Sequence, residues 1–274
     1  MAPPAFGQDA KGDAGPAERS PAQTSPGQAV DLELVLAVDV SMSMDLTEQK
    51  HQRDGYVAAF RSQAVIDAIM KTGAHGRIAV VYLEWAGSRI QSVVVPWRVI
   101  SDARSAFAFS AELASKPIAR AYKTSISSAL LKSAELFDAN RITAPRRVID
   151  VSGDGPNNAG PQVDTIRDNV VARGITINGL ALQFTRPEGP YSYFDLHDLD
   201  KYYAGCVIGG PGAFMISVSD PTRFGQAIQR KLLLEIADRR KPLQPRAPPL
   251  VQKAQFRLKG GRPSFDCLIG EKRW

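Results

Sequence analysis

Apolar runs of strand length alternate with segments of helical periodicity between residues 31 and 237. The first apolar run predicts a buried strand over 32–38, and the segment after it predicts one long helix over 47–71. The apolar positions that recur at helical spacing in that segment are Val57, Phe60, Ala64 and Ala68. The chain therefore begins its folded part with a strand followed by a helix.

The same two patterns continue to residue 237. Further strands are predicted at 77–85, 89–100, 146–152, 175–182 and 212–218. Further helices are predicted at 101–114 with a Ser101 cap, at 124–139 with a Thr124 or Ser125 cap, at 161–173 ending at Gly174, and from Ser219 to about 237. A short Ala-Gly-Ser turn joins the second and third strands, which predicts an antiparallel hairpin, and Pro96 places the far end of that hairpin at a sheet edge.

Alternation of strands and helices predicts an α/β fold. We expect a doubly wound, mostly parallel central sheet with one antiparallel edge strand and helices on both faces. In such sheets ligands bind at the carboxyl ends of the strands, near the point where the strand order reverses. Candidate chemistry should therefore follow directly after strands.

Composition divides the chain of 274 residues into three parts. Residues 1–30 are rich in Pro, Ala, Gly and Ser and are predicted to be disordered, 31–237 form the folded domain, and 238–274 form a basic tail rich in Pro and Gly. This tail holds ten Lys and Arg against three Asp and Glu, so the net charge of +6 belongs to it. We expect a solvated, mobile tail that touches anionic surfaces weakly, and no specific nucleic-acid binding.

The sequence leaves the compartment open. No apolar stretch reaches the roughly 18 residues of a spanning helix. The opening segment PPAFGQDA is similar to the small-residue end of a secretory signal peptide, so the alternatives are a periplasmic or secreted protein whose signal was trimmed or lies upstream, and a cytoplasmic one. The two cysteines, Cys206 and Cys267, have no metal-binding spacing, and a bridge between them is neither required nor excluded.

Oxygen-bearing side chains gather in the loops that follow the predicted strands. Asp39 ends the first strand and is followed by Ser41 and Ser43, Thr124 precedes a helix, and Asp154 follows the 146–152 strand. Oxygen ligands with few charges suit a hard divalent cation, Mg²⁺ or Mn²⁺. Each of these residues alone has a structural explanation as a cap or a turn, but together they predict a metal site.

This set of residues is similar to the metal-ion-dependent adhesion site of von Willebrand factor A (VWA) domains. Asp39-Val40-Ser41-Met42-Ser43 resembles the Asp-x-Ser-x-Ser motif of that family, Thr124 resembles its loop threonine, and Asp154-Gly155 resembles its third element. The resemblance covers about residues 31–237, and SGDGPNN and VIGGPGAF resemble a bacterial VWA-like family of unassigned function. Two departures are Met42 and Tyr122-Lys123, where glycine is common in the family, and the Lys123 charge is expected to weaken metal binding.

The resemblance implies a binding module and not an enzyme. A metal held by Asp39, Ser41, Ser43, Thr124 and Asp154 would be completed by an Asp or Glu carboxylate of an unidentified protein partner. Aromatic residues of the 183–211 loop have two explanations, the rim of that interface and packing on the sheet edge. These aromatic residues are Tyr191, Tyr193, Phe194, Tyr202 and Tyr203.

Two other functions remain open from the sequence. A metal-assisted hydrolase would need a general base near the ion, and His51, His75 and His197 show no ligand spacing. A metal-free scaffold would keep the motif for its loop structure alone. The sequence contains neither a GxxxxGK[ST] phosphate loop nor a GxSxG nucleophile elbow, which disfavours those two enzyme classes.

Overall fold

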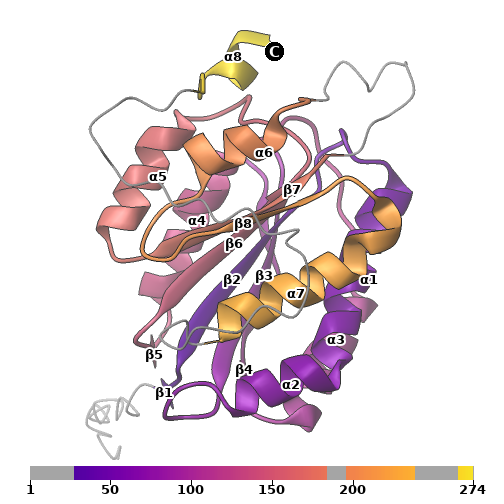
Figure 1. Ribbon diagram of the computed structural model, residues 1–274, viewed down its shortest axis with the longest axis vertical. Coiled ribbons are helices and arrows are strands. Elements are labelled where there is room, and N and C mark those ends of the chain that lie inside the picture. Colours follow the sequence, from indigo (N-terminus) through magenta and orange to yellow (C-terminus); the bar gives the residue numbers. More distant parts are fainter. Residues whose placement is uncertain (1–27, 184–195, 238–264, 274) are drawn as a thin grey trace, which may run out of the picture.

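A six-stranded sheet forms the centre of the protein (Figure 1). The computed structural model describes residues 28–183, 196–237 and 265–273. In spatial order the strands of this sheet are β4 (Gln91–Ile100), β3 (Ile78–Trp85), β2 (Leu32–Asp39), β6 (Arg147–Gly153), β7 (Thr176–Leu182) and β8 (Met215–Val218).

The sheet is parallel except at one edge. All neighbouring strands from β3 to β8 pair in parallel, and β4 pairs antiparallel with β3. Pro96 lies on this edge strand, where the register with β3 shifts between Val80 and Tyr82. A proline removes one backbone donor, and a bulged edge strand tolerates that loss. The predicted sheet, with its antiparallel edge hairpin, is confirmed.

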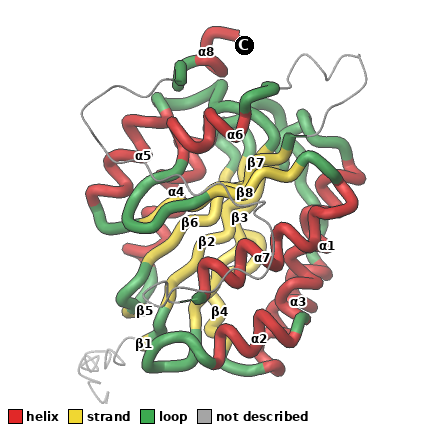
Figure 2. Tube along the Cα trace, viewed as in Figure 1, coloured by secondary structure: helices red, strands yellow, loops and turns green. Residues whose placement is uncertain are grey.

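Helices cover both faces of the sheet (Figure 2). One face packs against α1 (Leu46–Arg61), α2 (Gln63–Met70), α3 (Ala103–Ser115) and α7 (Phe224–Ile236), which a 3₁₀ turn at Pro221–Arg223 precedes. The other face packs against α4 (Ile126–Ala139), α5 (Val163–Ala172), α6 (Leu199–Tyr202) and a π-helical turn at Tyr203–Val207.

The central strand β2 is apolar on both faces because both are buried. Leu34 and Leu36 pack with the α1 and α7 side, whereas Val35 and Ala37 pack with the α4 side. Successive side chains of a strand point to opposite faces, so a doubly covered strand reads as a continuous apolar run. This explains why the sequence shows a run and not an alternation at this strand.

The helix predicted over 47–71 is two helices. Ser62 has extended backbone angles, and its hydroxyl accepts a hydrogen bond from the N–H of Val65, which caps α2. After this break the buried residues are Val65, Ile66 and Ile69, while Ala64 is exposed. A serine favours helix starts because its side chain replaces a missing backbone partner. Similarly, Asp102 and not Ser101 caps α3.

The folded part extends beyond the predicted limits of 31 and 237. A short strand β1 (Gln28–Ala29) pairs in parallel with β5 (Ile142–Thr143), so residues 28–30 are part of the domain. Residues 265–273, predicted as part of a mobile tail, include helix α8 (Ile269–Arg273) and are joined to the domain by a disulfide between Cys206 and Cys267. The rest of both predicted terminal segments lies outside the described residues.

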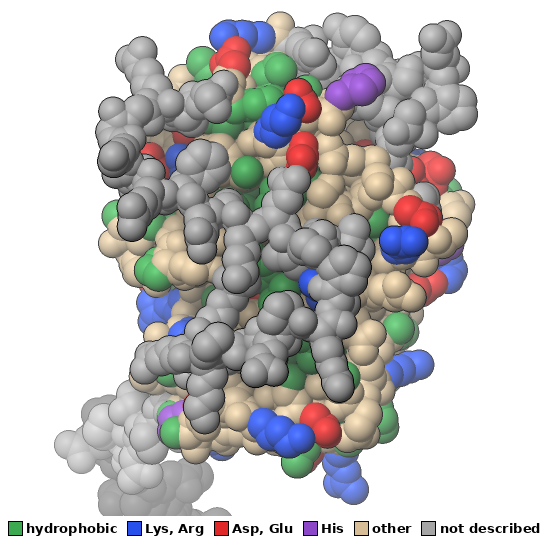
Figure 3. Space-filling view, in the orientation of Figure 1, with side chains coloured by type: hydrophobic (Ala, Val, Ile, Leu, Met, Phe, Trp, Pro, Cys, Tyr) green, Lys and Arg blue, Asp and Glu red, His purple; other side chains and the backbone are tan. Residues whose placement is uncertain are grey.

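Charged side chains of both signs are scattered over the described surface that Figure 3 shows. Within the described residues, most ion pairs between exposed side chains are local, such as Lys50 with Asp54 and Lys132 with Glu135. None of the helices in the described part of the chain has the length and apolar composition of a membrane span.

Candidate metal centre

The fold brings the candidate metal ligands to one end of the sheet. Asp39 is the last residue of β2, and Asp154 follows the last residue of β6, the neighbouring parallel strand. From β2 the chain continues to β3 on one side, and β6 lies on the other side. The two carboxylates therefore lie where the strand order reverses, the expected position of a ligand site in this class of sheet.

Four of the five predicted ligands form one hydrogen-bonded chain. The Oδ1 atom of Asp39 accepts the N–H of Ser41 at 2.7 Å, which holds the loop after β2 in a tight turn. The hydroxyls of Ser41 and Ser43 are 2.7 Å apart, and Ser43 donates to Oδ1 of Asp154 at 2.7 Å. The spacing of two residues in the motif thus connects all three residues to Asp154 through one chain of hydrogen bonds.

Thr124 reaches the same place from a different loop. Its hydroxyl oxygen is 3.9 Å from the point where a Cβ on Gly155 would lie. Its backbone is fixed by Asn158, whose Oδ1 accepts the N–H of Thr124 at 2.8 Å and whose own N–H donates to the Thr124 carbonyl at 2.8 Å. Next to it, Ser125 caps α4 by accepting the N–H of Ser128. The structure therefore links Asp39, Ser41, Ser43 and Asp154 directly and places the Thr124 hydroxyl beside Gly155, the residue after Asp154.

The carboxylate of Asp39 is buried and only half satisfied. Its side chain is fully buried, and its Oδ2 atom has no hydrogen-bond partner among the described residues. Burial, and next the charge of Asp154, raise the pKa of Asp39 well above its ordinary value of 3.8. A buried carboxylate without a partner is costly, and a cation would remove that cost. This unsatisfied oxygen fits a bound metal ion.

A tyrosine hydroxyl lies beside the same carboxylate. A Cβ on Gly153 would lie 2.9 Å from Oδ2 of Asp39 and 2.9 Å from the hydroxyl of Tyr203, so only glycine allows both to approach. The Tyr203 hydroxyl is buried without a hydrogen-bond partner in the described residues. Burial, and next the Asp39 charge, raise the pKa of Tyr203 well above 10.0, so it remains a hydrogen-bond donor.

Of the two explanations for the aromatic residues of the 183–211 loop, packing on the sheet holds for the two residues that the structure describes. Tyr202 and Tyr203 are fully buried against the sheet, because the short helix that carries them packs into the core with α5 and β7. The hydroxyl of Tyr202 accepts the N–H of Asn157 at 3.0 Å, inside the loop that follows Asp154. The other three aromatic residues of this loop, Tyr191, Tyr193 and Phe194, lie outside the described residues.

Two exposed apolar residues lie close in sequence to the candidate ligands. Tyr122 is 77% exposed and lies two residues before Thr124, and Leu46, the first residue of α1, is 61% exposed and lies three residues after Ser43. The loop before α1 pairs with the loop before Thr124, since the N–H of Met42 donates to the carbonyl of Ala121 at 2.9 Å. A sequence pattern cannot show this pairing, because it depends on the contact between two distant loops.

The donor set is composed of oxygen atoms. In the described part of the chain no three His, Cys, Asp or Glu side chains gather in one place, and the candidate centre has two carboxylates and three hydroxyls. Such a set suits Mg²⁺ or Mn²⁺, which take about six oxygens and usually keep several waters. The residues present therefore fit a hard divalent cation that has open positions for further ligands.

The topology is that of a VWA-like fold. Proximal thread matrix protein 1 from the mussel byssus, in a structure with a zinc-occupied metal-ion-dependent adhesion site, matches with a TM-score of 0.52 and 12% identity over 77% of this chain and 49% of that chain. The pilus adhesin SpaC from Lactobacillus rhamnosus GG matches with a TM-score of 0.53 and 11% identity over 77% of this chain and 31% of that chain. The chain thus spans less than half the length of these proteins.

The profile of one protein family covers most of the chain. The family described as a protein of unknown function (DUF1194) matches residues 29–240, and the chain belongs to this family. No curated protein matches the chain. The matched range ends before Cys267, so residues 265–273 are an addition to the part that the family profile covers.

Proposed function

We propose that this protein is a binding module that recognises a protein partner through a divalent cation. Asp39, Ser41, Ser43, Thr124 and Asp154 would hold Mg²⁺ or Mn²⁺. An Asp or Glu carboxylate of the partner, which is not identified, would complete the coordination. The ion supplies a strong, directional contact to an anionic group, and the loops around it supply selectivity.

The observation that carries this proposal is the state of Asp39. Its Oδ2 atom is buried, has no hydrogen-bond partner in the described residues and lies near a second carboxylate. A purely structural turn would need only an acceptor for the Ser41 N–H, which an asparagine would supply without a buried charge. A cation explains why a carboxylate stands at this position.

The structural neighbours support the coarser part of the proposal. One of them is described with zinc in its metal-ion-dependent adhesion site, and another is described as a pilus adhesin. Their identities to this chain are 12% and 11%, so what they share with it is the fold. The transfer of metal binding to this chain therefore depends on its own five oxygen ligands.

The surface beside the candidate centre favours an acidic partner with apolar contacts. Lys123 is exposed and makes no ion pair with any described residue, and its φ of 68° places it in the left-handed region next to Thr124. Tyr122 and Leu46 provide exposed apolar surface on either side. Interfaces commonly combine aromatic anchors with complementary charge at the rim.

We propose binding without catalysis, so no residue is assigned a catalytic role. The three histidines, His51, His75 and His197, are exposed, and in the described structure none hydrogen-bonds to a candidate ligand. A metal-assisted hydrolase would need such a base close to the ion. A metal-free scaffold is the competing explanation, and it predicts that cations have no effect.

The disulfide indicates in which cellular compartment the protein is located. Cys206 and Cys267 are joined, and disulfides persist in oxidising compartments such as the periplasm or outside the cell. This supports the exported alternative over the cytoplasmic one. We therefore propose that the partner is also an extracytoplasmic protein.

Calorimetric titration of the full chain with Mn²⁺ tests the metal site. We expect saturable binding in the wild type and none in Asp39→Asn, which keeps an acceptor for the Ser41 N–H but removes the charge. Asp45→Asn is the matched control, because Asp45 is an exposed cap of α1 outside the centre and asparagine also caps well.

Acetate tests the role of the partner's carboxylate. If a carboxylate completes the coordination, acetate and Mn²⁺ must each raise the affinity for the other. Acetate is therefore expected to tighten Mn²⁺ binding in the wild type. Equal Mn²⁺ binding in the wild type and Asp39→Asn, or no binding in either, would contradict the proposal and favour the metal-free scaffold.

A further inference from the structure

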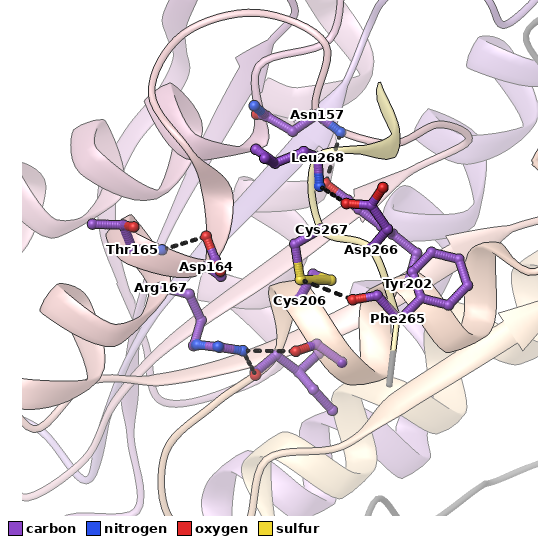
Figure 4. Close-up of a disulfide and its surroundings, with 12 residues drawn as sticks. Asn157, Asp164, Thr165, Arg167, Tyr202, Cys206, Phe265, Asp266, Cys267 and Leu268 are labelled. Atoms are coloured by element: carbon purple, nitrogen blue, oxygen red, sulfur yellow. Dashed lines mark hydrogen bonds between the residues drawn. A yellow bond between two sulfur atoms is a disulfide. The ribbon is translucent and has the colours of Figure 1, made fainter. Parts of the chain in front are cut away.

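The C-terminal segment 265–273 is fixed to the end of the molecule that carries the candidate metal centre. Figure 4 shows the disulfide between Cys206 and Cys267, with Phe265 and Tyr202 beside it. The rings of Phe265 and Tyr202 pack edge to face, with their centroids 6.0 Å apart. In Figure 1, α8 lies at the end of the molecule where β2, β6 and β7 finish.

This segment makes a specific contact with the loop that follows Asp154. Glu271 accepts a hydrogen bond from Nδ2 of Asn157 at 2.8 Å. A Cβ on Gly270 would lie 1.9 Å from the carbonyl oxygen of Asn157, so α8 packs directly on the backbone of this loop. Both contacts are long-range and neither belongs to a turn or cap of α8 itself.

Asn157 connects this contact to the candidate ligands. Its side chain is fully buried, and its Oδ1 accepts the N–H of Ser127 at 3.0 Å, in the first turn of α4. Its neighbour Asn158 holds the backbone of Thr124. Glu271 therefore reaches, through Asn157, the loop that carries Asp154 and the start of α4, which follows Thr124.

The other half of the disulfide leads to Asp39. Cys206 belongs to the π-helical turn Tyr203–Val207, and the hydroxyl of Tyr203 lies beside Oδ2 of Asp39 across Gly153. Both sulfur-bearing residues are buried, with Cys206 0% and Cys267 7% exposed. The disulfide thus joins the turn Tyr203–Val207, which lies beside Asp39, to segment 265–273, which contacts the Asp154 loop.

We propose that the disulfide-linked segment 265–273 supports the metal centre. Its Glu271 is a positioning residue that holds the Asp154 loop through Asn157. This inference rests on the proposed function and deepens it. Groups that orient the ligands of a metal commonly change its affinity about 10- to 100-fold when they are removed. The segment would therefore set the affinity for the cation without touching it.

Paired substitutions in the full chain separate positioning from general stability. Glu271→Ala removes the acceptor for Asn157 and is expected to weaken Mn²⁺ binding about tenfold. Glu271→Gln keeps an acceptor oxygen and is expected to retain the wild-type affinity. Lys71→Ala is the control, because Lys71 is exposed and its ion pair with Asp67 on α2 lies outside segment 265–273.

Glycine substitutions test the packing contact independently. Gly270→Ala would bring a methyl group onto the Asn157 carbonyl and is also expected to weaken Mn²⁺ binding about tenfold. Gly225→Ala is the matched control, because a Cβ there meets no atom within 4 Å. Melting temperatures of the metal-free variants are measured alongside, and affinity losses without comparable losses of stability are the expected result.

Reduction of the disulfide between Cys206 and Cys267 is a third test of the inference. Dithiothreitol transfers two electrons and two protons to the disulfide, which becomes two thiols, and is itself oxidised to a cyclic disulfide. We expect reduction to weaken Mn²⁺ binding in the wild type and to have less effect in Glu271→Ala, where the contact is already lost.

Three results decide the inference. Weaker binding in Glu271→Ala and Gly270→Ala with retention in Glu271→Gln supports it. Mn²⁺ binding that is present in the wild type and unchanged in both variants would overturn it and leave the proposed function standing. No Mn²⁺ binding in the wild type would overturn the proposed function, and this inference with it.

Discussion

The carboxylate of Asp39 combines full burial with an unsatisfied oxygen. Its Oδ1 is held by the backbone of Ser41, whereas Oδ2 faces Gly153 and the Tyr203 hydroxyl. No described Lys or Arg forms an ion pair with it. In the metal-free protein this residue therefore lowers stability, and a bound cation would reverse that effect.

Replacing Asp39 with asparagine should stabilise the metal-free protein at neutral pH. The folded state raises the pKa of Asp39 above 3.8, so the unfolded chain loses this proton first as the pH rises. The free energy of unfolding therefore falls from pH 3.8 to the folded-state pKa and stays at the lower level above it. Asp39→Asn removes this loss.

Urea denaturation in the presence of a chelator measures this effect. At pH 7 we expect Asp39→Asn to be more stable by on the order of 1–3 kcal/mol, the cost of a buried polar group without a partner. Asp45→Asn is the control. An Asp39→Asn variant that is less stable than the wild type would show that the carboxylate has a structural role, as a metal-free scaffold requires.

The predictability of individual residues depends on how local their role is. Asp39, Ser41 and Ser43 could be predicted because their hydrogen bonds join residues two positions apart. Tyr203 could not, because its position beside Asp39 depends on how a distant helix packs on the sheet. Asn157 was visible in the SGDGPNN stretch, but its contacts with α4 and α8 require the folded chain.

At the scale of elements, α7 is attached to the sheet by buried charges. Lys231 pairs with Asp150 on β6 and with Glu235 one turn along the helix, and Asn178 on β7 donates to Glu235 at 3.2 Å. Tyr56 of α1 also faces this cluster, since the Asp150 and Glu235 charges act on its hydroxyl. Two carboxylates share one ammonium here, so one of them is disfavoured as an anion.

This cluster predicts that stability falls with rising pH. Burial first, and the Asp150 charge next, raise the pKa of Glu235 from 4.5 to about 8. The unfolded chain releases this proton near pH 4.5 and the folded chain near pH 8, so the free energy of unfolding decreases between these values. Glu235→Gln should flatten this dependence.

Denaturation at pH 5 and pH 9 tests the prediction for Glu235. The wild type should lose on the order of a few kcal/mol more than Glu235→Gln between these two conditions. Glu135→Gln is the control, because its side chain is 67% exposed. A wild type and a Glu235→Gln variant with the same pH dependence would show that Glu235 is ionised throughout.

Element boundaries were predicted well where the apolar pattern was continuous and poorly where a polar residue changed the path of the chain. The strands around β2 and β6 follow directly from their apolar runs. The single helix over 47–71 failed because Ser62 has extended backbone angles, ends α1 and caps a new helix. Helical periodicity cannot show such a break when both halves are apolar enough to continue.

At the scale of the whole molecule, the parallel sheet determines where the candidate centre lies. Its strands end at one edge, and this edge also receives the disulfide-linked segment 265–273. Composition predicted that this segment belonged to a mobile tail, because Pro, Gly and cations dominate 238–274 as a whole. The disulfide between Cys206 and Cys267 instead fixes residues 265–273 to the domain.

Anomalous diffraction from crystals of the full chain grown with MnCl₂ tests the central claim most directly. The binding proposal predicts a manganese peak among Asp39, Ser41, Ser43, Thr124 and Asp154, with ligand oxygens at roughly 2.0–2.3 Å. Crystals of Asp39→Asn grown in the same way should lack it. A wild-type structure with no peak at these residues, or with manganese only at other carboxylates, would contradict the assignment of a metal-dependent binding site.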